Sequence, residues 1–410
     1  MIPPLPASVV STLKSKIDTL CNIPNKPGIP GAVFVAVDKN GERFAHASGK
    51  RGVASNEPMT LDSVFSILSC TQLVTGIACM QLVEQKVLRL DDADQVERLA
   101  PELKDVKVLQ GGGQLVEKTN RITLRMLLSH TSGFGYTFSH EGLRDYSYPA
   151  GYDEFSGHIS GISQPLVHQP SEAWRYGVGV DWAGILLERA TSLKLGDYMQ
   201  KNIFEPLGIT EISFAPSEQM KSKLAYMNQR AVDGTLSGRD HLLNRSLRLQ
   251  SEDDAKALFH SGGSGLFAQP RGFAKIISTL LNDGISPDTN RQILQKETVD
   301  QMFTNQIPQF PNFGRQPVAG AKPLLANPSG DIYPNNNKPQ GHGLSFMITG
   351  GVTGRSDGTA GWAGLANVFW WADREKEVGG IIATQILPLG DMDATMLSAQ
   401  LEATVYAALT

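Results

Sequence analysis

Ser69 is the residue of this sequence best placed to act as a nucleophile, and Gln72 follows it by one helical turn. This spacing along a helix brings two side chains onto one face, within hydrogen-bonding distance. A serine paired in this way with a lysine is typical of enzymes whose hydroxyl attacks an acyl carbon, with the amine as its base. The amide of Gln72 can orient the hydroxyl but cannot take its proton at neutral pH. The pair therefore indicates acyl-transfer chemistry with a weakened base.

The segment after Ser69 predicts a buried helix. Residues 73–83 are apolar around most of the helix circumference, as is typical of a helix inside a domain. At the start of such a helix, free backbone N–H groups and the helix dipole stabilise negative charge on a substrate oxygen. A serine in this position is also explained as a simple N-cap, so Ser69 needs support from other segments.

Tyr176 is the second candidate for chemistry. It lies in the segment 173–184, where a glycine-rich turn leads into a predicted helix and would hold the ring rigidly. A phenol with an ordinary pKa of about 10 becomes a usable base only where a cation or hydrogen-bond donors stabilise the phenolate. The absence of a lysine at position 72 therefore matters for Tyr176 as well as for Ser69. On its own, a tyrosine before a glycine is also explained as a packed aromatic residue.

The elements that must position these residues include two predicted β-hairpins. Residues 32–37 form an unbroken apolar run, followed by the polar turn 38–41 and a second stretch through Phe44 and Ala47, which predicts a buried hairpin. Near the other end of the chain, residues 368–371 and 378–383 flank a polar turn in the same way. The two ends of the chain therefore predict one antiparallel sheet.

Helices are predicted beside this sheet and between its halves. Val10, Leu13, Ile17 and Leu20 have the spacing of an amphipathic surface helix, and Leu397, Leu401 and Val405 predict a last helix. Glycines and prolines divide the middle of the chain into short helices. We therefore expect a sheet subdomain made of residues 1–61 and 341–410, and a mostly helical subdomain over residues 62–340. The proline- and asparagine-rich part at 306–340 predicts a surface excursion near the mouth of the site.

Composition favours an ordinary globular protein. The chain has 410 residues, of which 41% are hydrophobic and 19% charged, enough to bury a substantial core. Its formal net charge of -4 gives no reason to expect nucleic acid or an anionic membrane as partner. Cys21, Cys70 and Cys79 are too few and too far apart for a disulfide framework. Because no targeting segment and no long apolar run is recognised either, we expect a cytoplasmic protein.

Taken together, these segments resemble the class C β-lactamase superfamily, most closely its family VIII esterase and fungal lovastatin-acyltransferase-like branch. The resemblance covers nearly the whole chain. It implies a β-lactamase/transpeptidase-like α/β (α+β) fold, with an antiparallel sheet from both termini flanked by helices, and a mostly helical subdomain. The segments that carry the resemblance are 29–32, 65–75, 88–92, 122–133, 174–177, 181–184, 203–209 and 361–364.

The resemblance also implies roles for individual residues. Ser69 corresponds to the acyl-accepting nucleophile, and Tyr176 to the base or acid paired with it, while Gln72 occupies the position of the family's lysine. The stretch Trp362-Ala363-Gly364 matches the third motif, an edge strand beside the site in relatives. The backbone N–H of Leu365 would join that of Ser69 as the oxyanion hole. Candidate residues for the apolar wall are Trp174, Trp182, Trp362, Phe134 and Tyr136.

Three interpretations of Gln72 remain open. In the first, it is a substitution introduced to slow the enzyme or trap its substrate. In the second, it is a natural change in an enzyme whose Tyr176 works without the lysine. In the third, the chain is a binding protein. Loss of a general base costs on the order of 10² to 10⁴ in rate, so an intact oxyanion hole would still leave measurable activity.

Several other motifs are explained by structure instead of chemistry. Ser11 and Lys14 form a formal Ser-x-x-Lys, but both are predicted on the solvent face of the first helix. The segment 354–358 matches Gly-x-Ser-x-Gly without the apolar helix that a nucleophile elbow requires. His130 is predicted to be a satisfied, buried residue at a structural corner, and Cys70 a packing residue. The histidines show no metal-ligand spacing, and Gly111 to Gly113 lack the setting of a phosphate loop, so no metal, nucleotide or other cofactor is expected.

These observations predict an enzyme that takes an acyl group onto Ser69 and passes it to water or to an alcohol of a small hydrophobic natural product. The fungal branch suggests secondary metabolism, with a small-molecule ester or a carrier-bound or CoA thioester as acyl donor. The alternative is a non-hydrolytic or ligand-binding relative, favoured by the missing lysine. A true β-lactamase is disfavoured, because Trp362-Ala363-Gly364 replaces a lysine-containing motif that binds the antibiotic carboxylate.

Overall fold

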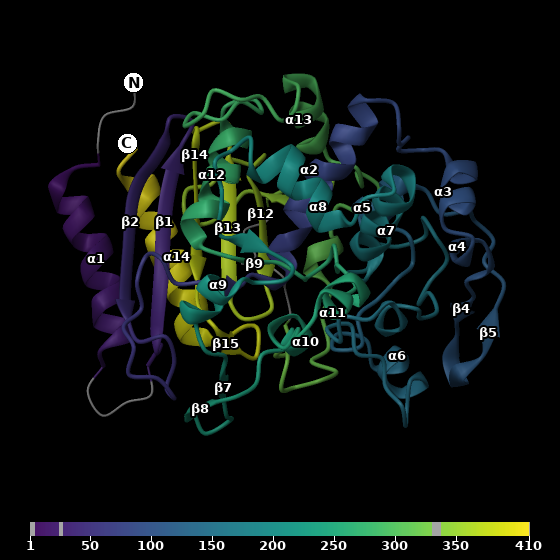
Figure 1. The fold of residues 1–410 in the computed structure, drawn as a ribbon, viewed down its shortest axis with the longest axis horizontal. Helices are drawn as coiled ribbons and strands as arrows, with labels where there is room; N and C mark the ends of the chain where they lie inside the picture. Colours follow the sequence, from purple (N-terminus) through teal and green to yellow (C-terminus); the bar gives the residue numbers. More distant parts are fainter. Residues whose placement is uncertain (1–4, 24–27, 330–337, 410) are drawn as a thin grey trace.

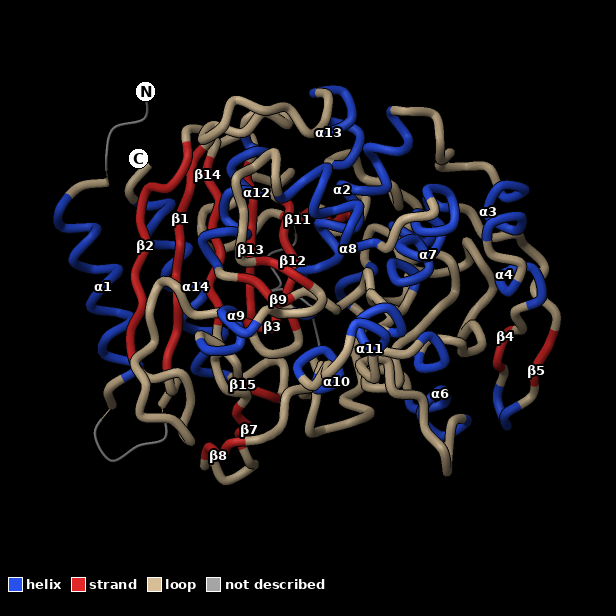
Figure 2. The backbone as a smooth tube through the Cα atoms, in the orientation of Figure 1, coloured by secondary structure: helices blue, strands red, loops and turns tan. Residues whose placement is uncertain are grey.

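The computed structural model describes residues 5–23, 28–329 and 338–409. Long strands gather at one end of the molecule, while short helices and loops fill the other (Figure 1, Figure 2). The main sheet is antiparallel throughout, and its order confirms that both ends of the chain build it. In spatial order its described strands are β10 (Gln340–His342), β11 (Met347–Thr349), β12 (Ala360–Gly364), β13 (Val368–Asp373), β14 (Val378–Ala383), β1 (Gly31–Asp38) and β2 (Gly41–Gly49).

The unbroken apolar run of β1 is explained by burial on both faces of the sheet. Val35 packs into the large core that continues into the helical half of the molecule, whereas Phe34 points into a second core on the opposite face. Helices α1 (Ala7–Cys21) and α14 (Met392–Ala407) cover that second face, and α12 (Pro270–Leu281) packs on the first (Figure 1). A strand covered on both sides needs apolar residues at every position.

Both predicted hairpins are confirmed, with one correction. β1 pairs with β2 and β13 with β14, and β1 and β14 join the two hairpins through the register Val33↔Ala383 to Asp38↔Val378. The first hairpin is not buried as a whole, because β2 is the edge strand of the sheet and most of its residues are partly or fully exposed. The predicted amphipathic first helix is confirmed, since α1 buries Leu13 and Ile17 against the sheet and α14.

Apart from α2 and α7, the remaining elements are short, as the glycine and proline breaks predict. The other helices are α2 (Thr71–Glu84), α3 (Ala93–Leu99), α4 (Glu102–Asp105), α5 (Leu124–Leu128), α6 (Glu141–Tyr146), α7 (Gly179–Thr191), α8 (Leu195–Met199), α9 (Glu218–Ser222), α10 (Asn244–Leu247), α11 (Glu252–Ala257) and α13 (Lys296–Met302). The tighter or wider turns are η1 (Leu68–Cys70), η2 (Gly111–Gly113), η3 (Ile159–Gly161), η4 (Gln200–Phe204) and η5 (Phe313–Arg315). The minor sheets comprise β15 (Ile386–Leu387), β7 (Asn228–Arg230) and β8 (Leu236–Gly238); β3 (Phe65–Ser66), β9 (Phe267–Ala268) and β6 (Ile212–Ser213); and β4 (Val108–Leu109) with β5 (Leu115–Val116).

One hydrophobic core spans both of the predicted subdomains. It includes Val35 of the sheet and Leu186 of α7, so packing continues across the predicted boundary. The division into residues 1–61 and 341–410 against residues 62–340 stays a prediction.

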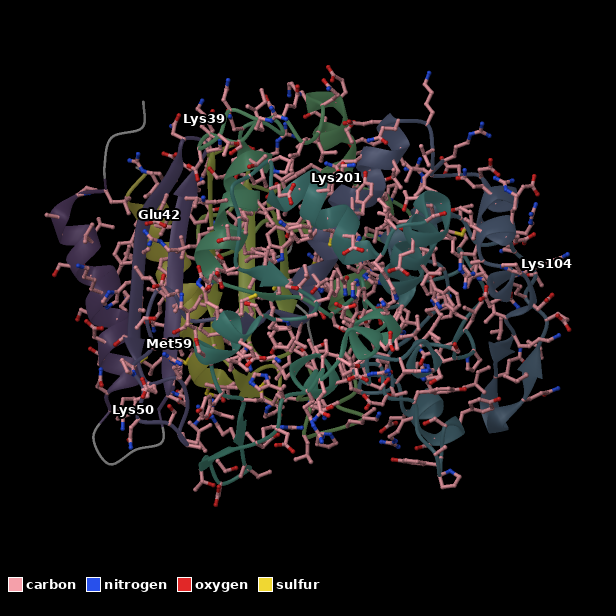
Figure 3. The ribbon with its side chains drawn as sticks, viewed as in Figure 1. Lys39, Glu42, Lys50, Met59, Lys104 and Lys201 are labelled. Carbon is pink, nitrogen blue, oxygen red and sulfur yellow. The ribbon has the colours of Figure 1, made fainter. Side chains whose placement is uncertain are left out.

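The surface and the thiols are those of a typical globular chain. Exposed lysines such as Lys50 and Lys104 lie at opposite ends of the molecule (Figure 3). Cys21, Cys70 and Cys79 are free thiols. Within the described ranges, no helix combines the length and apolar character needed to cross a membrane.

The second core predicts a test of the fold. Phe34 is fully buried, with its ring centroid 5.9 Å from that of Phe44 and 6.1 Å from that of Trp371. Because Phe34→Ala leaves a cavity between sheet and helices, we expect the free energy of unfolding in urea to fall by about 3 to 5 kcal/mol. The control Val352→Ala, at a side chain with 70% exposure, is expected to change it by less than about 0.5 kcal/mol. An equal, small loss in both variants would contradict a tightly packed second core.

Candidate active site

Ser69 lies in the turn η1, between strand β3 and helix α2. Helix α2 is buried over residues 71–82, which confirms the predicted buried helix. Leu68, directly before Ser69, has a φ of 47°. This left-handed conformation is unfavourable for a leucine and is found mostly where function requires it. Ser69 keeps 7% exposure whereas Leu68 and Cys70 have none, so Ser69 is the residue of this turn that solvent still reaches.

Tyr176 lies in the tight loop that leads into α7. At Gly177 a Cβ atom would lie 2.3 Å from the carbonyl oxygen of Phe134, so only glycine allows the loop to approach this closely. The predicted rigid turn is thereby confirmed. The Tyr176 ring is held by neighbouring rings with centroid distances of 4.9 Å to His130, 4.8 Å to Tyr136 and 5.0 Å to Trp362.

The structure brings Ser69, Gln72 and Tyr176 together around one phenol oxygen. Gln72 Nε2 donates to Tyr176 Oη over 2.7 Å, and Trp362 Nε1 donates to the same oxygen over 3.3 Å. The Ser69 hydroxyl lies near enough to this phenol to lower its pKa. A phenol oxygen that receives several hydrogen bonds is prepared to carry negative charge. The arrangement is that of a nucleophile and a base with two donors behind the base.

The pKa of Tyr176 reflects two opposing effects. Burial of the phenol raises its pKa to about 12, while the hydrogen bonds with Ser69, Trp362 and Gln72 act in the opposite direction. Although part of the residue is exposed, its hydroxyl lies in dehydrated surroundings. No cation takes part in these stabilising contacts, so the phenolate form is scarce at neutral pH.

The amide of Gln72 is fully buried, and each of its polar atoms has a partner. Nε2 also faces the carbonyl oxygen of Gly263 at 3.3 Å, and Oε1 lies 3.0 Å from His130 Nε2. Since an amide oxygen only accepts, His130 must be the donor in this last contact. A chain of hydrogen bonds therefore runs from His130 through Gln72 to Tyr176.

Sequence analysis missed His130 and Gly263 as parts of this site. His130 is buried as predicted, with a φ of 56° at the corner after α5, and one of its two ring nitrogens is hydrogen-bonded. Its Nδ1 has no partner among the described residues, and its Nε2 serves Gln72. The usable signal was the pair of buried polar residues, Gln72 and His130, since buried polar groups require partners.

Asp181 holds the loop that carries Gly263. Its carboxylate accepts hydrogen bonds from the Gly263 N–H over 3.0 Å and from the Ser261 hydroxyl. Burial raises the pKa of Asp181 to about 6, although both hydrogen bonds lower it. The buried carboxylate therefore fixes the backbone behind Gln72, with part of its charge lost in mildly acidic solution.

The third motif lies on β12, beside the turn that carries Ser69. β12 is an interior strand, so the implied edge strand is wrong for the strand as a whole. Its neighbour β11, however, pairs only with Ala360 and Gly361, which leaves Trp362-Ala363-Gly364 without a strand on that side. At Gly364 a Cβ atom would lie 2.4 Å from the carbonyl oxygen of Ile67, so the motif packs directly on the turn that carries Ser69.

The turn after β12 carries Leu365 and is fixed by Asn367. Asn367 is fully buried with a φ of 57°, and its Nδ2 donates to the carbonyl groups of Ile386 over 2.8 Å and Pro388 over 2.9 Å. Its Oδ1 accepts from the N–H groups of Gly390 over 3.0 Å and Asp391 over 3.2 Å. Every polar atom of this amide is thus used to hold the turn.

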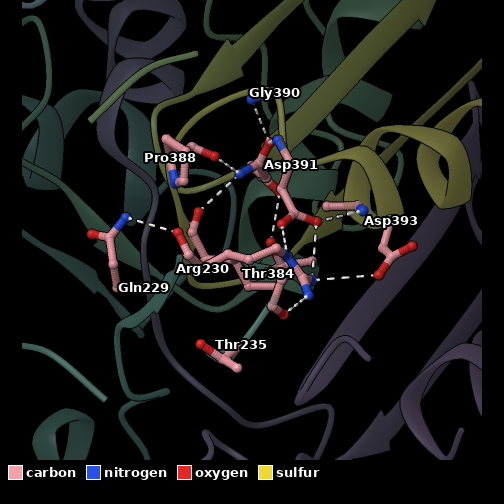
Figure 4. A network of polar contacts seen from close by, with 12 residues as sticks. Gln229, Arg230, Thr235, Thr384, Pro388, Gly390, Asp391 and Asp393 are labelled. Carbon is pink, nitrogen blue, oxygen red and sulfur yellow. Dashed lines mark hydrogen bonds and ion pairs between the residues drawn. The ribbon is translucent and has the colours of Figure 1, made fainter. Parts of the chain in front are cut away.

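A charged pair supports the same turn from outside. Arg230 forms an ion pair with Asp391, whose side chain is fully buried and caps α14, and a longer one with Asp393 at 3.5 Å. Figure 4 shows Pro388 and Gly390 next to Asp391, with Arg230 on the other side of the carboxylate. The backbone beside Ser69 is therefore tied to β7 and to the last helix.

Trp174 and the described part of the 306–340 segment enclose the site from one side. The Trp174 ring lies 4.6 Å from that of Phe313 and 5.9 Å from that of His342, measured between centroids. The predicted excursion therefore reaches the site through Phe313, and its residues 330–337 lie outside the described residues. Trp362, with 6% exposure, completes this aromatic group.

Two predicted wall residues belong to the core instead. Phe134 and Trp182 have 1% and 3% exposure and stack on each other with ring centroids 6.2 Å apart. Side chains this deeply buried support the loops of the site from beneath and do not line an open cleft. Tyr136 is similarly buried but lies in contact with the Tyr176 ring.

The motifs set aside in the sequence lie outside the site. Ser11 and Lys14 are exposed on α1, and the 354–358 segment is a turn that leads into β12. Cys70 is fully buried, and burial raises the pKa of its thiol, as expected of a packing residue. In the part of the chain that is described, no group of three or more His, Cys, Asp or Glu side chains is arranged to hold a metal ion.

A separate surface hollow does not compete with this cluster as a site of chemistry. It is lined by Glu42, Arg271, Lys275 and Asp288 among others. Arg271 pairs with Glu42 and Lys275 with Asp288, so these charges satisfy one another. The hydrogen bonds that converge on Tyr176 beside Ser69 mark the candidate active site more specifically than the shape of a hollow.

Known proteins resemble this chain over nearly its whole length. The family model described as Beta-lactamase matches residues 17–404. The chain is 32% identical over 399 residues to the monacolin J acid methylbutanoyltransferase of Aspergillus terreus, covering 92% of each protein. It is 34% identical over 392 residues to the lovastatin esterase of Penicillium rubens, covering 90% of this chain and 92% of that one.

The solved structures give the same result. A mutant of the simvastatin synthase LovD from Aspergillus terreus superimposes with a TM-score of 0.80 at 29% identity, covering 98% of this chain and 96% of that one. A family VIII carboxylesterase superimposes with a TM-score of 0.65 at 17% identity, covering 98% of both chains, which supports the fold alone.

Asp181 gives the site a testable pH dependence. Its pKa of about 6 exceeds the ordinary 3.8, so the folded protein binds the proton more tightly than the unfolded chain. The contribution to stability is therefore full below about pH 4 and is lost as the pH rises through about 6. We expect Asp181→Asn to make the free energy of unfolding less dependent on pH between 4 and 7, by up to about 3 kcal/mol. Parallel urea titrations of the two proteins across this range would measure it, and identical pH profiles would contradict it.

Proposed function

Because this chain belongs to the beta-lactamase family, we propose that it is a serine enzyme that takes an acyl group onto Ser69 and passes it to an alcohol or to water. The observation that carries this proposal is the pair of hydrogen bonds that Gln72 and Trp362 donate to the phenol of Tyr176, with the Ser69 hydroxyl close to the same phenol. The relatives named as acyltransferases and esterases support the same type of reaction.

In the proposed first step, the phenolate of Tyr176 takes the proton of the Ser69 hydroxyl while Oγ attacks the acyl carbon. The new C–O bond pushes the carbonyl electrons onto oxygen, and the backbone N–H groups of Ser69 and Leu365 stabilise that oxyanion. Collapse of the intermediate expels the donor's alcohol or thiol, which receives the proton from Tyr176. The acceptor hydroxyl then repeats the sequence in reverse and releases the new ester or, with water, the acid.

Gln72 and Trp362 act on this sequence through Tyr176. Their N–H groups donate to the phenol oxygen, which lowers the cost of the phenolate without supplying a charge. With a pKa of about 12, only about 10⁻⁵ of the tyrosine is ionised at pH 7. The enzyme is therefore proposed to be active but slower than a relative with lysine at this position.

The substrates are proposed by analogy with the relatives and from the aromatic surroundings of the site. The acceptor is a small hydrophobic natural product with a hydroxyl group, by analogy with the monacolin J acid and lovastatin in the relatives' names. The donor is a small-molecule ester or a carrier-bound or CoA thioester. Nucleic acid and membrane are not proposed as partners, and the cytoplasmic location stays a prediction.

The second candidate is a ligand-binding relative that transfers no acyl group. It is favoured by one observation, the amide of Gln72 in place of the family's lysine. The intact contacts of Ser69 and Tyr176 weigh against it, since a binding protein has no need to keep a serine against a tyrosine hydroxyl.

The first test is acylation of Ser69. After incubation with p-nitrophenyl butyrate, and separately with a butanoyl thioester, we expect intact-protein mass spectrometry to show a gain of one acyl group. Ser69→Ala is expected to abolish it, whereas the matched control Ser11→Ala, at the exposed serine of α1, retains it. No adduct in any of the three proteins, with either donor, would move the assignment to the binding protein.

The second test concerns the missing lysine. Because the phenolate fraction controls the rate, we expect acylation of the parent to accelerate nearly tenfold for each pH unit between 7 and 9. Gln72→Lys supplies a cation beside Tyr176 and is expected to raise the rate at pH 7 by roughly 10² to 10⁴ with a flatter pH profile. Stopped-flow release of p-nitrophenol, corrected for spontaneous hydrolysis, measures both. Equal rates and parallel profiles would remove Tyr176 and Gln72 from the mechanism.

A further inference from the structure

We propose that His130 is a positioning residue, which holds the amide of Gln72 in the one orientation that presents an N–H group to Tyr176. The proposal rests on the proposed function of Ser69 and Tyr176. It concerns the orientation of the side chain at position 72, which matters for the amide of a glutamine but not for the ammonium group of a lysine.

An amide differs from an ammonium group in having two unlike ends. The ammonium of a lysine presents equivalent N–H donors whatever its rotation, whereas an amide presents a donor from nitrogen and only an acceptor from oxygen. The two orientations of a glutamine side chain have nearly the same shape, so packing alone does not choose between them. If Oε1 faced Tyr176, the phenol would donate its proton to the amide, and this bond would favour the neutral phenol over the phenolate.

Two contacts on the far side of the amide decide the orientation. The carbonyl oxygen of Gly263 can only accept, and it lies 3.3 Å from Gln72 Nε2. His130 Nε2 lies closer to the other end, 3.0 Å from Oε1, and donates to it. The shorter contact is the more favourable one, and its loss would leave the buried amide oxygen unsatisfied. His130 therefore contributes the larger part of the preference.

His130 is itself held in the state that this role requires. Burial, together with nearby His342, keeps the pKa of His130 well below its ordinary value, so the ring is neutral and carries a single N–H. The rings of Trp174, Tyr176, His342 and Trp362 surround it, with centroids between 4.9 and 6.4 Å away. Nδ1 has no partner in the described ranges, so the proton resides on Nε2, where Gln72 accepts it.

The backbone supports the same interpretation. His130 has a φ of 56°, a conformation that costs energy for a residue with a side chain and persists where the surroundings demand it. Its backbone carbonyl accepts a hydrogen bond from the Arg175 N–H over 2.9 Å, one residue before Tyr176. The corner that carries His130 and the loop that carries Tyr176 are thus joined, which fixes the imidazole relative to the phenol.

The experiment compares His130 variants in two backgrounds, the parent and Gln72→Lys. His130→Leu removes the donor at similar volume, and His130→Gln restores an N–H at about the position of Nε2. In the parent we expect His130→Leu to lower the maximal acylation rate by roughly tenfold or more, with the half-saturating donor concentration unchanged, and His130→Gln to recover most of it. In the Gln72→Lys background we expect His130→Leu to cost less than about threefold, because an ammonium needs no orientation.

The outcome that overturns the proposal is an equal loss from His130→Leu in both backgrounds, since a purely structural histidine is needed equally in each. Failure of His130→Gln to recover more activity than His130→Leu would also overturn it. Urea unfolding gives a readout without catalysis. We expect His130→Leu to reduce the free energy of unfolding less in a Gln72→Leu background than in the parent. If no variant acylates Ser69, the proposed function fails, while additive unfolding effects would separately refute the His130–Gln72 contact.

Discussion

The hydrogen bond from Gln72 Nε2 to Tyr176 Oη is the contact on which the site depends, because it joins the two elements that carry its chemistry. Gln72 belongs to α2, the buried helix that directly follows the turn carrying Ser69, whereas Tyr176 belongs to the loop before α7. The two helices pack against each other, so the phenol stays beside the nucleophile. Neighbouring residues support this contact. Gly263 and His130 bind the Gln72 amide, and Gly177 allows the loop of Tyr176 to approach closely.

Most of the fold was predictable, because its signals are local. The apolar run at 32–37 and the polar turns after it specify strands and hairpins within a few residues, and the comparisons confirm the family that the motifs indicate. The position of each strand within the sheet was harder to predict from the sequence. Whether a strand is at an edge depends on partners far along the chain, which is why β2 was predicted too buried and β12 was taken for an edge strand.

The candidate site was predictable as a set of residues but not as a network. Ser69, Gln72 and Tyr176 came from motifs, and the structure brings them together. His130 was recognised as a buried corner residue without its partner, because Gln72 lies 58 positions away and no pattern links them. Asn367 gave no signal either, since its role is to satisfy backbone groups of a turn whose shape the sequence does not show. The prediction that Phe134 and Trp182 line the wall of the site was wrong for a related reason. An aromatic side chain near a motif can belong to the core, as these two do.

The pairing of β1 with β14 has a consequence for how the chain folds during its synthesis. Residues 33–38 can complete the centre of the sheet only after residues 378–383 have been synthesised. During translation the N-terminal hairpin must wait for nearly the entire chain, with one long edge of β1 unpaired. Ser69 is made early, but the strand that should lie beside it emerges from the ribosome late. Until then the unpaired edge of β1 is open to wrong pairing with another strand.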